Sequence, residues 1–168
     1  MRRLYLAVGA VALAASASLV PRVLARPAAL PPRVAAAPEA PTGVGDVAGL
    51  TPAMRRAVRL ATEAAAADGV ELRVTSGWRS EEHQRRLYEA AIAKYGSPAA
   101  ARRWVLPPVE SAHVRGEAVD VGPPAAAAWL EEHGVRWGLC RRYENEPWHF
   151  ERLAAAKGST CPAMEPHA

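Results

Sequence analysis

Apolar residues recur at helical spacing in the segment that follows residue 50. The stripe has the three-to-four-residue period of a helix with one buried face: Met54, Val58, Ala61 and Ala65. Thr51 precedes it as a candidate N-cap, and Pro52 suits the first helical position because its fixed backbone angle matches a helix. Gly69 ends the stripe. The pattern therefore predicts a helix over residues 52–68.

Two further helices are predicted from their ends. Ser80 can cap a helix that carries two glutamates in its first turn, where the helix dipole favours negative charge, and that ends near Gly96. The dipeptide Pro123-Pro124 opens a third helix, which stops at Gly134. Between these helices, a loop is expected around Pro107-Pro108.

Short strands are predicted between the helices. Residues 70–76 (VELRVTS) alternate apolar and polar side chains, and residues 117–121 (EAVDV) form a second such segment. A last short strand is expected within residues 146–151. Because helices and strands are mixed without a regular βαβ order, we expect an α+β domain with a small antiparallel sheet and flanking helices.

The N-terminal part of the chain differs from the rest. Arg2 and Arg3 precede an uncharged, mainly apolar run from Leu4 to Val20, so residues 1–25 are predicted to be a cleaved signal peptide or a retained membrane anchor. Residues 26–50 are rich in proline and alanine and are interpreted as a semi-rigid linker. The folded domain is then expected over residues 51–168, outside the cytoplasm.

Composition narrows the possibilities further. Half of the 168 residues are hydrophobic but only 6% are aromatic, so the core must be small and its tryptophans important; Trp104, Trp129 and Trp137 are expected in it. The net charge of +4 comes from scattered arginines that do not alternate with aromatics, which argues against a nucleic-acid interface. In an exported chain, Cys140 and Cys161 are expected to form a disulfide that tethers the C-terminal tail.

One group of residues suggests chemistry. His113 lies seven residues before Asp120 with Gly116 between them, so a loop that bends at the glycine can bring the two side chains together. His149 follows in the segment ENEPWHF, with Glu146 three residues before it. Two imidazoles and one carboxylate can hold a catalytic zinc ion, and Glu146 could then act on water. From spacing alone, a capped turn and a packed histidine explain these residues equally well.

Three motifs in order carry a family resemblance: SGWRSEEHQ, ESAHVRGEAVDVG and NEPWHFE. They resemble the motifs of the VanY-type D-alanyl-D-alanine carboxypeptidases, zinc peptidases of the bacterial cell wall with the hedgehog/DD-peptidase fold. The similarity covers most of residues 51–153, while the tail after Leu153 departs from the usual ending of the family.

The resemblance implies a role for each matched position. It implies that His113, Asp120 and His149 bind Zn²⁺, that Glu146 is the general base, and that Arg79 stabilises the oxyanion. Two further residues, Gln84 and Ser111, match positions that hold the peptide in similar enzymes. Outside the resemblance, Arg79 could form a surface salt bridge, Gln84 could be an ordinary polar residue of a helix face, and Ser111 could be a turn residue.

The resulting expectation is a zinc carboxypeptidase that removes the C-terminal D-Ala from peptidoglycan stem peptides. Variants of this hypothesis are an L,D-carboxypeptidase or a D,D-dipeptidase on the same scaffold. A hypothesis of another class is a non-catalytic, zinc-stabilised module that binds peptidoglycan; loss of Glu146 or Arg79 would have favoured it, and both are present. We expect a monomer that is secreted or anchored by its N-terminus, faces the cell wall and does not bind nucleic acid.

Overall fold

The structure is a computed structural model that describes residues 47–153 and 160–168. The predicted signal or anchor of residues 1–25 and most of the predicted linker, residues 26–46, lie outside the described residues. Within the described residues, no helix is both long and apolar enough to cross a membrane. Leu50, one residue before the predicted domain boundary, is buried in the core.

The first helix forms where the apolar stripe predicted it. α1 spans Pro52–Ala67, and the Thr51 hydroxyl accepts a hydrogen bond from the backbone N–H of Met54 at 3.2 Å, as an N-cap does. Gly69 follows with a φ of 76°, a left-handed conformation that glycine adopts without strain. The stripe residues are buried and the opposite face of the helix is exposed.

The second helix also matches its prediction, and a short one follows it. α2 spans Glu81–Tyr95, is capped by the Ser80 hydroxyl, and ends at Gly96 in the left-handed region. α3 (Pro98–Ala101) was not predicted, because four residues are too short to show a helical period.

The third predicted helix ends at the predicted residue, and a 3₁₀ helix follows it directly. α4 spans Pro124–His133, but Gly134 has a φ of −62° and begins the 3₁₀ helix η1 (Gly134–Trp137). The prediction that this helix stops at Gly134 is therefore confirmed. Glycine is needed here for space rather than for a left-handed turn, because a Cβ at this position would lie 2.5 Å from the backbone oxygen of Leu139.

The predicted α+β class with a small antiparallel sheet is confirmed. The four strands are β1 (Arg73–Ser76), β2 (Ala118–Gly122), β3 (Leu139–Arg141) and β4 (His149–Arg152). They form one antiparallel sheet in the order β1-β2-β4-β3. Ser76 of β1 and His149 of β4 are the neighbours of Asp120 on either side, so three adjacent strands present three polar side chains in a row.

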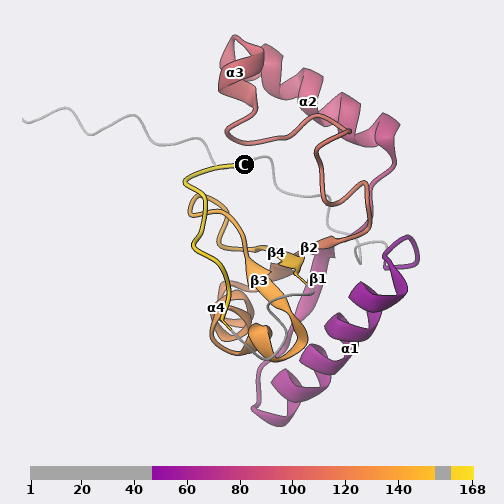
Figure 1. The fold of residues 1–168 in the computed structure, drawn as a ribbon, viewed down its shortest axis with the longest axis vertical. Helices are drawn as coiled ribbons and strands as arrows, with labels where there is room; N and C mark the ends of the chain where they lie inside the picture. Colours follow the sequence, from indigo (N-terminus) through magenta and orange to yellow (C-terminus); the bar gives the residue numbers. More distant parts are fainter. Residues whose placement is uncertain (1–46, 154–159) are drawn as a thin grey trace, which may run out of the picture. The chain divides into compact units, whose positions relative to one another are not determined.

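Most of the apolar core lies between the sheet and two helices. Figure 1 shows α1 and α4 beside the sheet, with α2 and α3 together at the other end of the domain. Residues of α1, α4, β2 and β4 share the core, with Phe150 and Met54 among its largest fully buried side chains. Trp129 belongs to it and Trp137 packs against it, as expected. Trp104 does not, because it stacks on Tyr95 beside α3.

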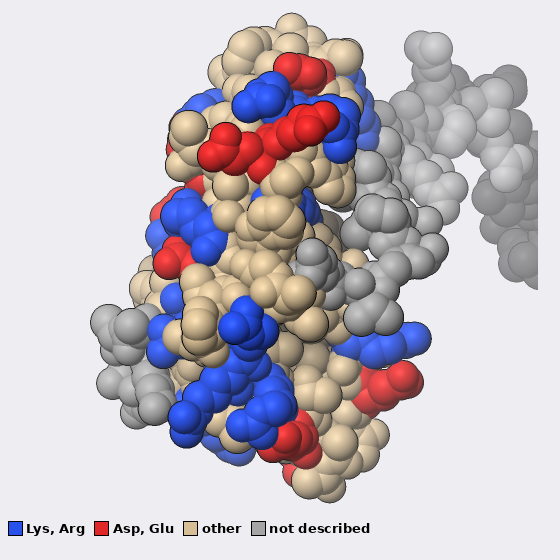
Figure 2. All heavy atoms as spheres, turned by 90° about the vertical axis from the view of Figure 1, so that its right-hand side faces the viewer, with Lys and Arg blue, Asp and Glu red and all other residues tan. Residues whose placement is uncertain are grey.

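The predicted disulfide is confirmed. The disulfide Cys140–Cys161 is present and joins β3 to the C-terminal segment. In Figure 2, acidic and basic side chains lie beside one another in the upper part of this face, and several basic side chains gather in its lower half. Exposed ion pairs such as Arg59–Glu63 and Arg86–Glu82, both at 2.6 Å, follow the one-turn spacing of their helices.

Candidate active site

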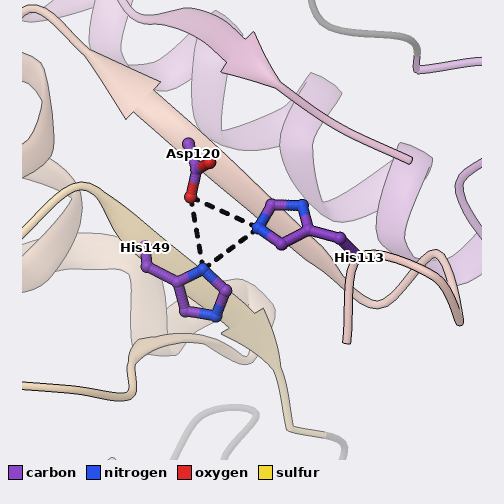
Figure 3. A group of neighbouring side chains, drawn as sticks. All are labelled: His113, Asp120 and His149. Atoms are coloured by element: carbon purple, nitrogen blue, oxygen red, sulfur yellow. Dashed lines mark hydrogen bonds and ion pairs between the residues drawn. The ribbon is translucent and has the colours of Figure 1, made fainter. Parts of the chain in front are cut away.

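His113, Asp120 and His149 meet at the middle of the sheet. His113 Nε2 lies 3.2 Å from His149 Nδ1, and Asp120 Oδ1 lies 3.4 Å from the first of these nitrogens and 3.2 Å from the second. Figure 3 shows the three side chains pointing toward one another from separate stretches of chain. All three are buried, with exposed fractions of 4%, 6% and 5%. We refer to His113 Nε2, His149 Nδ1 and Asp120 Oδ1 as the ligand triangle.

The sheet fixes two corners of the ligand triangle, and a tight turn fixes the third. Asp120 of β2 and His149 of β4 are direct cross-strand partners. His113 lies in the loop before β2, which turns at Gly116 with a φ of 69°. A Cβ on Gly116 would lie 2.6 Å from the backbone oxygen of Gly49, so both the turn and the packing require glycine. The predicted bend at this glycine therefore brings His113 to the strand.

Hydrogen bonds at the far sides of both rings orient the imidazoles. His113 Nδ1 donates to the backbone oxygen of Gly77 at 2.7 Å, and His149 Nε2 donates to Glu151 Oε1 at 3.2 Å. Because each outer nitrogen holds its proton against an acceptor, each inner nitrogen faces the ligand triangle and offers its lone pair when it is not protonated. Two imidazole lone pairs and a carboxylate oxygen thus converge on one point.

This donor set fits a zinc ion. Tetrahedral zinc binds nitrogen at about 2.0–2.1 Å, which separates neighbouring ligand atoms by about 3.3 Å. The three sides of the ligand triangle, 3.2 to 3.4 Å, match that separation. The three atoms also form the group of metal-binding type that is found among the described residues. Three protein ligands leave a tetrahedral position for a non-protein ligand, as in catalytic zinc sites.

Charge around the ligand triangle also favours a cation. Burial would raise the pKa of Asp120, but interactions with His113 and His149 outweigh burial and hold this pKa well below its usual range. Burial lowers the pKa of His113. Burial would also lower the pKa of His149, but its hydrogen bonds to Asp120 and Glu151 raise it to about 10. The carboxylates therefore favour positive charge at His149, which a proton or a metal ion can supply.

Glu146 lies at the edge of the ligand triangle. Its Oε2 is 3.8 Å from His149 Nδ1, while its side chain is mostly buried. Burial raises the pKa of Glu146 to about 7, which is a suitable value for a group that exchanges protons at neutral pH. Glu144, two residues earlier, is exposed, and its described bonds are made by its backbone.

Arg79 binds the opposite side of Asp120. Its Nη2 donates to Asp120 Oδ2 at 2.7 Å, so one oxygen of this carboxylate faces Arg79 and the other faces the ligand triangle. The guanidinium also donates twice to the Ser76 hydroxyl, at 3.0 and 2.8 Å. Arg79 therefore lies in a buried ion pair beside the ligand triangle rather than in a surface salt bridge.

The two predicted peptide-binding residues lie farther from the ligand triangle. Gln84 is only 2% exposed, accepts a hydrogen bond from Arg79 Nη1 at 3.4 Å and donates to the Leu106 backbone oxygen at 2.7 Å. Ser111 is buried, and its backbone N–H donates to the oxygen of Pro107. Gln84 thus joins Arg79 to the loop that contains Ser111.

Sequence reasoning missed two members of the site, Ser76 and Glu151. Ser76 lies at the end of β1 beside Asp120, which only the strand register reveals. Glu151 is two positions after His149, and alternate residues of a strand share one face, so the sequence HFE carried a usable signal.

Comparison with known proteins agrees with this geometry. The sequence model of the VanY D-alanyl-D-alanine carboxypeptidase family matches residues 48–154. The chain is 34% identical over 113 residues to the D-alanyl-D-alanine carboxypeptidase of Enterococcus faecalis, an alignment that covers 52% of this chain and 42% of that protein. The chain therefore spans less than half the length of this curated relative.

Solved structures show the same likeness. A variant of the vancomycin resistance D,D-pentapeptidase VanY from a VanB-type cassette, in complex with Zn(II), superposes with a TM-score of 0.59 at 30% identity, covering 65% of this chain and 76% of that one. The LdcB LD-carboxypeptidase superposes with a TM-score of 0.58 at 25% identity, covering 65% and 62%. These relatives share the hedgehog/DD-peptidase type of fold predicted from the motifs.

Proposed function

This chain belongs to the VanY family of D-alanyl-D-alanine carboxypeptidases, and we propose that it is a zinc-dependent carboxypeptidase that removes the C-terminal D-Ala from peptidoglycan stem peptides. The observation that carries the proposal is the ligand triangle with a mostly buried glutamate beside it. The Zn(II) bound by the related D,D-pentapeptidase supports the choice of metal. The disulfide supports action outside the cytoplasm, where stem peptides are exposed and disulfides persist.

His113, Asp120 and His149 would hold the zinc ion through the three atoms of the ligand triangle. A zinc ion held there would supply Lewis acidity, which polarises a carbonyl group and makes water more acidic. The hydrogen bonds from His113 to Gly77 and from His149 to Glu151 keep both rings in the orientation and tautomer that binding requires.

Glu146 would act as the general base. Its position beside the ligand triangle allows Oε2 to accept a proton from the water that attacks the scissile carbonyl. With a pKa near 7, the protonated carboxyl can then give that proton to the amine that leaves as D-Ala. One carboxylate would in this way serve both halves of the hydrolysis.

Arg79 would stabilise the negative charge that develops on the carbonyl oxygen. Its guanidinium is held by Asp120 and Ser76, so it is already positioned before substrate arrives. Gln84 would act through Arg79, because the amide of Gln84 bonds to both Arg79 and Leu106. Ser111 would shape the peptide-binding end of the site from the same loop.

An L,D-carboxypeptidase activity is the second candidate. The similarity to the LdcB LD-carboxypeptidase, at 25% identity, favours this alternative, since both activities act on the same class of stem peptide. The two differ in the bond that is cut. A pentapeptide that ends in D-Ala-D-Ala and a tetrapeptide that ends in a single D-Ala would separate them.

Purified protein incubated with both peptides tests the proposal. We expect D-Ala release from the pentapeptide, loss of that release with a chelator, and its recovery when zinc is added. Glu146→Ala should still bind zinc but lower kcat by at least ~10²-fold, in the range that general acid–base catalysis contributes. Glu144→Ala is the matched control, an exposed glutamate two residues away that should keep wild-type turnover.

Three results would count against the proposal. Release of D-Ala from the tetrapeptide alone would transfer the chain to the L,D class. Zinc-loaded protein that binds both peptides and cuts neither would identify a binding module. Near-normal turnover by Glu146→Ala would remove the glutamate from the general-base role.

A further inference from the structure

A cavity outside the ligand triangle lies between the end of α2, α3 and the C-terminal segment. Its volume is about 440 Å³, a size at which proteins bind small ligands or parts of larger ones. The residues that line it come from three separate stretches of chain: Tyr95, Ala100, Arg103, Trp104, Asn145, Pro166 and His167.

One wall of the cavity is aromatic. The rings of Tyr95 and Trp104 are stacked with centroids 5.8 Å apart and planes 14° apart. Trp104 is half-buried and lies outside the main apolar core, so core packing does not account for its position. A stacked aromatic pair is a flat, rigid surface against which amide and aliphatic groups pack well.

Asn145 contributes a fixed polar group to the same cavity. Its Nδ2 donates to the backbone oxygen of Arg103 at 2.7 Å. Since that oxygen can only accept, the orientation of the amide is determined. Asn145 Oδ1 is enclosed and has no hydrogen-bond partner among residues 47–153 and 160–168. A buried acceptor that receives no hydrogen bond costs free energy, so a hydrogen bond from an N–H group of a ligand would remove that cost.

The third wall comes from the C-terminal segment, which is firmly attached. The disulfide Cys140–Cys161 holds its start, and Glu165 makes backbone hydrogen bonds with Arg142 and Glu144 at 2.9 and 2.8 Å. Glu165 also forms an ion pair with Arg142. Pro166 and His167 follow at once and line the cavity. The tail that departs from the usual family ending thus helps to build it.

One residue that lines the cavity, Asn145, is adjacent in sequence to the proposed general base Glu146. Asn145 directly precedes Glu146, so their Cα atoms are about 3.8 Å apart. An extended peptide advances about 3.3–3.6 Å per residue, so a stem peptide with its scissile bond beside Glu146 is long enough to extend to the neighbouring Asn145. A carboxypeptidase leaves a single residue on the C-terminal side of the bond. The segment long enough to enter the cavity is therefore the one on the N-terminal side.

We propose that this cavity is a subsite for the stem-peptide segment on the N-terminal side of the scissile bond. This proposal rests on the proposed carboxypeptidase function. Peptide amides pack on Tyr95 and Trp104, an N–H group donates to Asn145 Oδ1, and the exposed guanidinium of Arg103 receives a carboxylate of the segment. The subsite makes the enzyme favour a long stem peptide over a short one.

The test compares kcat/KM for a stem pentapeptide with kcat/KM for N-acetyl-D-Ala-D-Ala, which is too short to fill the cavity. Trp104→Ala and Arg103→Ala should each lower the ratio of long to short substrate about tenfold, mainly through KM for the pentapeptide. Arg56→Ala, which removes an exposed arginine on α1, is the matched control and should leave the ratio unchanged. Circular dichroism of each variant confirms that it is folded.

Calorimetric titration with the tetrapeptide product gives a readout that needs no turnover. Affinity should fall about tenfold in Trp104→Ala, and it should not change in Arg56→Ala. An unchanged long-to-short ratio in both cavity variants, or equal affinity of wild type and Trp104→Ala for the tetrapeptide, overturns the subsite. If the wild type cuts neither substrate, the proposed function fails, and the titration alone then decides whether the cavity binds peptide.

Discussion

The two ends of the domain differ in what holds them together. The sheet lobe, which consists of α1, the four strands, α4 and η1, contains nearly all of the main apolar core. The helical arm, residues 81–112 with α2 and α3, contributes no residue to that core and buries mainly small or polar side chains, such as Ala91, Ala101 and Gln84. Val109, in the loop of the arm, is 86% exposed.

The difference in packing parallels a difference in the proposed roles of the two ends, metal binding for the sheet lobe and substrate binding for the helical arm. Asp120 and His149 lie on paired strands of the sheet lobe, where packing fixes them to the precision that a metal ion needs. Arg79 lies at the entry to the arm, and the cavity of Tyr95 and Trp104 lies at its far end. The lobe that packs best would hold the metal, and the arm with the looser packing would meet the substrate.

The largest expected effect on the free energy of unfolding comes from truncating a large side chain in the core of the sheet lobe. Phe150→Ala should lower the free energy of unfolding by about 4 kcal/mol, because Phe150 is fully buried and adjacent to His149. Leu87→Ala, on the half-buried face of α2, should cost only about 1 kcal/mol. Urea unfolding of both variants in chelator measures the two values. Equal losses would mean that the arm is as tightly packed as the lobe.

A smaller but still large effect is expected where the lobe and the arm meet. Arg79→Lys keeps the positive charge but loses the planar set of donors, so kcat should fall about 10²-fold or more while zinc remains bound. Steady-state kinetics together with metal analysis of the purified variant provide the check. A lysine variant with wild-type kcat would show that charge alone is sufficient at this position.

The disulfide extends the rigidity of the sheet lobe to the C-terminal segment. Replacing both cysteines by serine should lower the free energy of unfolding by about 3 kcal/mol, since the bond closes a loop with a sequence separation of 21. Thermal unfolding with and without reductant measures this loss. A double variant as stable as the wild type would show that the segment is held without the bond.

The smallest predicted effect concerns the first helix. Thr51→Ala removes the hydroxyl that caps the N–H of Met54 and should cost about 1 kcal/mol. Thr51→Ser, which keeps the hydroxyl, should lose much less and serves as the control. Both are read from the midpoint of urea unfolding. If the serine variant were as unstable as the alanine variant, the methyl group rather than the cap would be responsible.

The elements that could be predicted from the sequence are those with a repeated pattern or a clear cap. α1 and α2 were located almost to the residue, because Thr51, Ser80, Gly69 and Gly96 mark their ends. α3, η1 and β3 have only three or four residues each, too few to show a period. Gly134 marks the end of α4 as predicted, although close packing rather than a left-handed turn requires glycine there.

The candidate site shows the same limit. His113, Asp120 and His149 were named from their motifs, and the structure brings them together. The contacts of Arg79 with Asp120 and Ser76 depend on strand register, and those of Gln84 depend on how the loop at Leu106 folds back. Such contacts join distant positions in the chain without leaving a local pattern. Asn145 could not be singled out, because its Oδ1 is notable only for lacking a hydrogen-bond partner among the residues that the structure describes.

Zinc binding tests the central claim most directly. Protein loaded with one equivalent of Zn²⁺ and measured by X-ray absorption should show two imidazole nitrogens and at least one oxygen at about 2.0–2.2 Å. His113→Ala should lose the imidazole signal of one ligand and bind the ion far more weakly. A wild-type protein that takes up no stoichiometric zinc, or whose zinc spectrum is unchanged by His113→Ala, would contradict the account.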